Sequence, residues 1–125
     1  MIVLDASVVM AFFKQEPGWD SVATHLRSSA VSTVNAAEVM SRFADVGSDP
    51  DFVHQQLVAT ECEIVPATVA HALIAARLRP LTRHLGLSLG DRICLALAIE
   101  RQCPALTADR NWANLKIGIP IQLIR

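Results

Sequence analysis

The sequence alternates between very short apolar segments and longer segments whose apolar residues recur at helical spacing. The short segments predict strands at residues 2–4, 30–33, 64–65, 105–107 and 121–124. The longer segments predict helices at residues 6–13, 19–27, 35–46, 51–60, 67–78 and 88–100, with a turn and a short helix over 109–115. Short apolar strands separated by helices form a mainly parallel sheet that is covered on both faces. The predicted fold is therefore a three-layer α/β/α domain.

The composition fits one domain spanning residues 1–125. At this length a chain buries about two-thirds of its unfolded surface, so one hydrophobic core is expected. The chain is 52% hydrophobic and 18% charged, which excludes disorder and leaves apolar surface for a partner or a second copy. Its formal net charge of −1 does not by itself indicate a nucleic-acid binder.

The termini and cysteines point to a cytoplasmic protein. Residues 8–13 form the longest uncharged apolar stretch, which is far shorter than the ~20 residues of a membrane span. Residues 1–5 lack the basic and apolar regions of a signal peptide. Three cysteines without a Cys-x-x-Cys spacing predict reduced thiols and no zinc site.

Four acidic residues follow strands or begin helices. Asp5 follows the first strand, Glu38 comes shortly after the second, Asp91 lies at the start of the apolar helix at 88–100, and Asp109 comes just after the fourth strand. Each acid has a structural alternative. Asp5 and Asp109 could cap the following helices, and the pairs Asn35 with Glu38 and Ser88 with Asp91 fit a capping box.

Together, however, the four acids predict a metal site. Carboxylates at one edge of a parallel sheet converge and repel, so such a cluster requires a cation or basic groups to neutralise it. Oxygen-only ligands suit Mg²⁺ or Mn²⁺. Carboxylate-held, water-rich metals of this kind commonly hydrolyse phosphodiesters.

Other chemistries lack their residues at these positions. A phosphoryl-aspartate hydrolase needs a second Asp at position 7, which is Ser7, and a response-regulator receiver needs an Asp where Pro66 stands. No phosphate-binding glycine loop is present. The four histidines lie in helical segments without a partnering Ser or Cys motif, so we interpret them as structural or surface residues.

Four segments resemble PIN-domain proteins, and specifically the VapC group of toxin ribonucleases from bacterial type II toxin–antitoxin pairs. They occur in the family's order across nearly the whole chain and comprise residues 3–7 (VLDAS), 35–39 (NAAEV), 87–92 (LSLGDR) and 106–112 (LTADRNW).

The resemblance implies an endoribonuclease that uses Mg²⁺ or Mn²⁺. Asp5 and Asp91 match the principal metal ligands, whereas Glu38 and Asp109 match acids that act through water or on a second ion. The polar residues that match positions orienting ligands or waters are Ser7, Asn35 and Thr107. For Ser7 and Thr107, a local cap or turn hydrogen bond is the alternative.

The resemblance also implies a VapB-type antitoxin that covers the early helices and blocks the acidic site, together with a homodimer. Five of the six aromatic residues lie in the first half of the chain: Phe12, Phe13, Trp19, Phe43 and Phe52. Core packing explains such residues, and an apolar groove for a peptide helix is the alternative.

Charge is segregated along the sequence. Residues 38–63 contain six acids and one arginine, whereas residues 71–92 contain one acid and the candidate RNA-binding residues Arg77, Arg79, Arg83 and Arg92. Solvated helix faces are the structural alternative. Two functional hypotheses follow: a metal-dependent ribonuclease toxin, or a non-catalytic PIN-fold module that binds nucleic acid in a toxin–antitoxin regulatory complex.

Overall fold

A five-stranded sheet organises the molecule in the computed structural model, which describes residues 1–125. Its strand order is β3-β2-β1-β4-β5, and every neighbouring pair is parallel. The strands are β1 (Ile2–Leu4), β2 (Ser29–Ser32), β3 (Glu63–Val65), β4 (Ala105–Thr107) and β5 (Ile121–Leu123). The α/β prediction is confirmed, and the sheet is entirely parallel.

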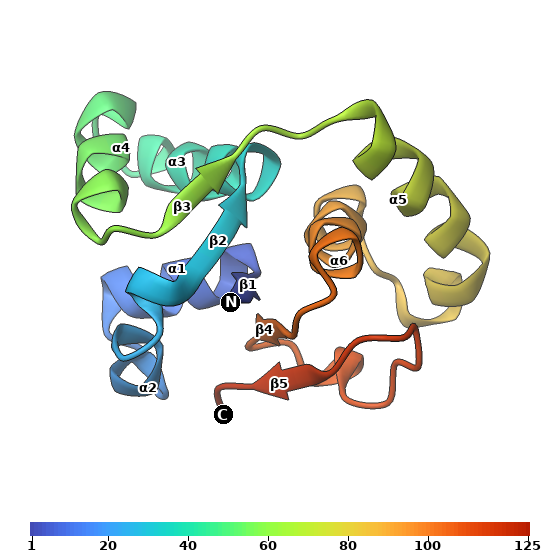
Figure 1. Ribbon diagram of the computed structural model, residues 1–125. Coiled ribbons are helices and arrows are strands. Elements are labelled where there is room, and N and C mark those ends of the chain that lie inside the picture. Colours follow the sequence, from blue (N-terminus) through green and yellow to red (C-terminus); the bar gives the residue numbers. More distant parts are fainter.

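Helices cover both faces of this sheet (Figure 1). The α-helices are α1 (Ala6–Lys14), α2 (Trp19–Ala23), α3 (Thr33–Asp45), α4 (Pro50–Ala59), α5 (Val69–Thr82) and α6 (Leu89–Arg101). Three 3-10 turns complete the chain: η1 (Leu26–Ser28), η2 (Arg83–Leu85) and η3 (Arg110–Trp112). None of the helices combines the length and apolarity needed to cross a membrane.

Two hydrophobic clusters lie on opposite sides of the sheet, because successive side chains of a strand point to opposite faces. Ile2 and Leu4 of β1 pack in the cluster formed with α1 to α4, whereas Val3 packs in the cluster formed with α5 and α6. The three-layer prediction is therefore confirmed. The three cysteines are buried free thiols, as predicted.

The strand order reverses between β1 and β4. The chain first builds outward from β1 to β2 and β3, and then places β4 and β5 on the other side of β1. Open parallel sheets bind ligands beside the carboxyl ends of their strands at such a switch point. Asp5 follows β1 directly and Asp109 follows β4 after one residue, so both lie at this edge.

The helix predicted at residues 19–27 is wrong in its length. The structure divides this segment into α2 and the 3-10 turn η1. The hydroxyls of Ser21 and Thr24 donate to the carbonyls of Gly18 and Ser21, and such local side-chain bonds compete with a continuous helix.

The helix predicted at residues 67–78 is also wrong at its end, because α5 continues through Pro80 to Thr82. Proline removes one backbone donor but lies here in the last turn of the helix. Leu78 and Thr82 are buried, and the Thr82 hydroxyl donates to the Leu78 carbonyl at 2.9 Å. Tertiary packing thus outweighs the local cost of the proline.

One predicted helix start needs correction. Ser32 caps α3 by accepting from the Val34 N–H, so Asn35 lies inside the helix and the predicted Asn35 capping box is wrong. The turn and short helix predicted over residues 109–115 are present, the helix being the three-residue η3. The remaining predicted boundaries differ from the structure by at most two residues, within the usual fraying of element ends.

Replacing Leu95 with alanine should destabilise the fold strongly. Leu95 lies on α6 with its side chain fully buried, so the lost packing should cost about 2 to 5 kcal/mol of unfolding free energy. Urea unfolding measures this cost. Leu81→Ala, at an exposed leucine on α5, is the matched control and should change the unfolding free energy by less than about 0.5 kcal/mol. Equal effects of the two substitutions would contradict the assignment of α6 to the core.

Candidate metal centre and partner groove

Asp5 is a buried carboxylate at the carboxyl end of the central strand. Its residue occupies the N-cap position of α1, but its side chain makes no capping hydrogen bond. Instead, the hydroxyls of Ser7 and Thr107 both donate to Asp5 Oδ2, at 2.7 and 3.0 Å. Both hydroxyls thus bond to the same carboxylate oxygen and hold it in place.

Backbone groups after β4 fix these two hydroxyls. The Ala108 N–H donates to Ser7 Oγ and the Asp109 N–H donates to Thr107 Oγ1, each at 3.0 Å. Both side chains therefore contact Asp5 and also bond to the turn after β4. This network joins the ends of β1 and β4 and restricts the orientation of the Asp5 carboxylate.

Asp91 is held by the first turn of α6. The Asp91 N–H donates to Ser88 Oγ at 3.1 Å, and Asp91 Oδ2 accepts from the Ser88 N–H at 2.9 Å. The predicted capping box is thus confirmed. This role and a ligand role are compatible, because the capping interaction occupies only one carboxylate oxygen.

Glu38 reaches α6 from the second turn of α3. Its Oε1 accepts from Asn35 Nδ2 at 2.9 Å, and the same amide nitrogen donates to the Gly90 carbonyl at 3.0 Å. Asn35 is fully buried, and its Oδ1 has no hydrogen-bond partner. The carboxylate of Glu38 therefore lies next to the residue that precedes Asp91.

Three of the four predicted acids raise the pKa values of neighbouring buried groups. The pKa of Asp5 is raised to about 6, mainly by burial, with repulsion from Asp91 adding to the shift and the Ser7 and Thr107 hydrogen bonds opposing it. Burial raises the pKa of the Cys94 thiol well above its usual range, and the charges of Asp5, Asp91 and Glu38 raise it further. The charges of these three acids thus act on the same buried thiol of α6.

Asp109 has a different environment. Its Oδ1 accepts from the Asn111 N–H at 2.9 Å, so the side chain caps η3. The predicted structural alternative is therefore present at Asp109. Its backbone still belongs to the network around Asp5, through Thr107.

The donor set fits a hydrated divalent cation. No three His, Cys, Asp or Glu side chains are grouped closely enough to hold one metal ion directly. Mg²⁺, however, usually keeps several waters and takes only one or two protein carboxylates. Asp5 and Asp91 would supply the direct oxygens, and Glu38 lies where it could act through water.

The arginines predicted to bind RNA have two kinds of environment. Arg77, Arg79 and Arg83 are exposed on or just after α5. Arg92 is partly buried and donates to the Ala75 carbonyl at 3.0 Å, which connects α6 to α5. The three exposed residues are accessible to a phosphate backbone, whereas Arg92 already has a structural contact.

The histidines do not join the acidic group. His25, His54 and His84 are exposed. His71 is buried, with Nδ1 accepting from the Thr68 N–H and Nε2 lying 2.7 Å from Glu100 Oε1. These contacts agree with the structural role predicted for the histidines.

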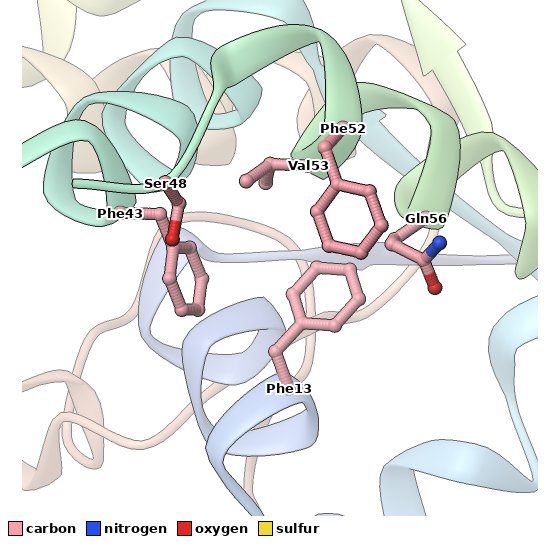
Figure 2. Close-up of a pocket in the computed structure, with 6 residues that line it drawn as sticks. All are labelled: Phe13, Phe43, Ser48, Phe52, Val53 and Gln56. Carbon is pink, nitrogen blue, oxygen red and sulfur yellow. The ribbon is translucent and has the colours of Figure 1, made fainter. Parts of the chain in front are cut away.

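An aromatic groove lies between α1 and α4. A pocket of about 260 Å³ is lined by Phe13, Phe43, Ser48, Phe52, Val53 and Gln56, and Figure 2 shows the three phenylalanine rings converging on it. A second pocket of about 400 Å³ shares Phe13 and Gln56 and extends to Phe12 and Trp19. Phe12 and Phe13 also pack against the core, which confirms the core interpretation for these two residues. The groove for a peptide helix stays a prediction.

The sequence motifs do not single out Gly90, because it belongs to no phosphate-binding glycine loop. The available signal was its position inside the first turn of an apolar helix, where alanine would be favoured by helix propensity. The reason for glycine becomes visible only when Glu38 is placed beside it.

The fold and the acidic edge define a PIN-like α/β protein. The family model of the PIN domain matches residues 2–118, and the chain belongs to this family. No curated protein sequence matches the chain significantly.

Solved structures share the fold over nearly the whole chain. VapBC2 from Rickettsia felis bound to a promoter DNA fragment has a TM-score of 0.74 at 16% identity, covering 98% of both chains. A toxin–antitoxin complex from Klebsiella pneumoniae has a TM-score of 0.72 at 18% identity, covering 95% of both. VapBC-5 from Mycobacterium tuberculosis has a TM-score of 0.57 at 25% identity, covering 98% of this chain and 96% of that one.

The raised pKa of Asp5 predicts a pH-dependent effect of Asp5→Asn on metal-free protein. Ionised Asp5 is penalised in the folded state, so this destabilisation appears as pH rises from the unfolded pKa, near 4, to the folded pKa of about 6. The asparagine variant should therefore match the original at pH 4 and exceed its unfolding free energy by up to about 3 kcal/mol at pH 7.5.

Urea unfolding in EDTA at the two pH values measures this difference. Asp45→Asn, at an exposed carboxylate near the end of α3, is the control and should show no such pH dependence. An Asp5→Asn effect of the same size at both pH values would contradict the raised pKa.

Proposed function

We propose that this protein is a metal-dependent endoribonuclease toxin of a type II toxin–antitoxin pair. The observation that carries the proposal is the placement of three acids near the switch point of the sheet: Asp5 directly follows β1, and Glu38 lies against Gly90, the residue before Asp91. Such carboxylates suit a divalent cation and phosphodiester hydrolysis. The similarity to toxin–antitoxin structures supports the same class.

Each acid has a distinct role in this proposal. Asp5 and Asp91 would hold Mg²⁺ or Mn²⁺, since the side-chain and backbone hydrogen bonds that orient them are made to Oδ2 of each carboxylate. Glu38 orients water at the same site. Asp109, whose carboxylate caps η3, acts through water or on a second ion.

When bound, the ion would activate water and stabilise the oxygen that leaves the cleaved phosphodiester. Ser7 and Thr107 keep the Asp5 carboxylate in one orientation, so little reorganisation is needed before reaction. Asn35 holds Glu38 against α6 in the same way.

The substrate in this proposal is RNA, and α5 supplies positive charge. Arg77, Arg79 and Arg83 are exposed and can contact phosphates without breaking an internal ion pair. With the four site acids neutralised by metal, eight acidic residues face 11 basic ones, so the remaining surface is mildly basic.

The aromatic groove would receive an antitoxin. Its pockets present converging rings that an amphipathic segment with large apolar side chains can fill. Phe13 lies near the far end of α1 from Asp5, about 12 Å along the helix axis. An inhibitor anchored in the groove therefore needs an extended arm to reach the acidic site, where a basic side chain would meet the carboxylates.

A homodimer in the cytoplasm completes the proposal. The resemblance implies the homodimer, and the exposed apolar side chains Val69, Leu73 and Leu81 on α5 agree with a further interface. The cytoplasmic location follows from the sequence arguments on the first residues and the cysteines. Sedimentation of the antitoxin-free protein measures the oligomeric state.

Replacing Asp5 or Asp91 with asparagine should abolish RNA cleavage. Either substitution removes a negatively charged ligand while keeping the side chain's shape, so metal-dependent activity should fall by more than about 100-fold. The assay uses antitoxin-free protein, total RNA and Mn²⁺, with EDTA added to a parallel sample.

Asp45→Asn is the charge-matched control for this assay and should keep full activity. Retained cleavage in both site variants would contradict the roles of Asp5 and Asp91. If the unchanged protein makes no metal-dependent cut, the result favours the alternative of a non-catalytic module that binds nucleic acid in a regulatory complex.

Phe52→Ala should weaken antitoxin binding. Phe52 lines the aromatic pocket yet is mostly exposed, so its removal should affect the partner more than the fold. The affinity for the antitoxin encoded by the neighbouring reading frame should fall about tenfold or more, as for an aromatic anchor. Calorimetry measures this change. Val58→Ala, at an exposed apolar residue of α4 outside both pockets, should bind normally, and equal losses would exclude the groove.

A further inference from the structure

The carboxylate of Glu38 occupies the space where a side chain at position 90 would begin. A Cβ built on Gly90 would lie 2.7 Å from Glu38 Cδ and 3.1 Å from Oε2, and would overlap Oε1. Real Cβ atoms essentially never come within 3.0 Å of such neighbours. The Glu38 carboxylate can therefore pack against α6 only because position 90 is glycine.

Backbone conformation does not account for this glycine. Unlike the other four glycines, Gly90 has no positive φ angle. It lies inside α6, where alanine is favoured over glycine by about 1 kcal/mol. The close contact with Glu38 is the feature that requires glycine here.

Asn35 fixes the same contact from the α3 side. Its amide nitrogen bonds to both Glu38 Oε1 and the Gly90 carbonyl, so one group joins the carboxylate to the backbone that supports it. Asn35 is fully buried, which protects these two bonds from competition with water. The Glu38 carboxylate is consequently held against Gly90, the residue before Asp91. The Asp91 carboxylate is itself fixed by Ser88.

We propose that Gly90 is a positioning residue that, together with Asn35, seats the Glu38 carboxylate beside Asp91. This inference rests on the proposed metal-dependent function. In this role, Gly90 determines where the Glu38 carboxylate of α3 lies relative to Asp91 of α6. Any side chain at position 90 moves Glu38 away from Asp91.

Gly90→Ala tests the proposal because the group it displaces is the end of a flexible side chain. Glu38 can swing away without movement of the backbone, so the variant should fold with unchanged or slightly raised thermal stability. Its affinity for Mn²⁺, measured by calorimetry, should fall about tenfold, as when a carboxylate near the ion loses its support. Cleavage should fall through kcat more than through KM.

A double-mutant cycle with Glu38→Ala separates positioning from a general structural effect. If Gly90→Ala acts by displacing Glu38, it should have no further effect on Mn²⁺ affinity once Glu38 is alanine. Independent, additive losses would overturn the proposal. Leu89→Ala, at the neighbouring exposed position, is the control and should bind Mn²⁺ normally.

A measurement on metal-free protein keeps this inference distinct from the proposed function. Nuclear Overhauser effects should connect the Gly90 Hα protons with the Glu38 Hγ protons in the unchanged chain, and their absence would overturn the inference even if Gly90→Ala failed to fold. Failure of the unchanged protein to bind Mn²⁺ or cut RNA would overturn the proposed function. Normal Mn²⁺ binding by a folded Gly90→Ala variant would overturn only the positioning role.

Discussion

A carboxylate buried at the end of the central strand is the constraint on which the site depends. Ionised Asp5 is costly in this environment, and burial raises its pKa to about 6. Ser7 and Thr107 offset part of that cost, and Thr107 can do so only because β1 and β4 lie side by side. The strand order that brings Thr107 to Asp5 is therefore a requirement of the site as well as of the core.

The two functional regions lie toward opposite ends of α1. The helix begins beside the acidic group, and its last turns carry Phe12 and Phe13 into the aromatic groove. α3 has the same arrangement, with Glu38 near its start and Phe43 farther along. Two helices thus connect the proposed metal centre to the proposed antitoxin surface, so a partner can hold one region while it blocks the other.

The local sequence predicted several features correctly for clear physical reasons. The Ser88 and Asp91 capping box depends on residues three apart, and the strand and helix types follow from apolar spacing. The Asn35 capping box is not formed, because Ser32 supplies an equally good cap three residues earlier. The helix α5 continues past Pro80, because buried Leu78 and Thr82 stabilise another turn.

The sequence alone determined the kind of chain this is: an alternating α/β domain of the PIN family with four acids after strands or at helix starts. Such features are encoded in residue type and spacing. Only the tertiary structure decided which of these acids share a region, since that depends on strand order and on contacts between α3 and α6. The structure also shows that the Asp109 side chain caps η3, whereas Asp5 interacts with Asp91. It further shows that position 90 must be glycine because the Glu38 carboxylate fills the space of a side chain there.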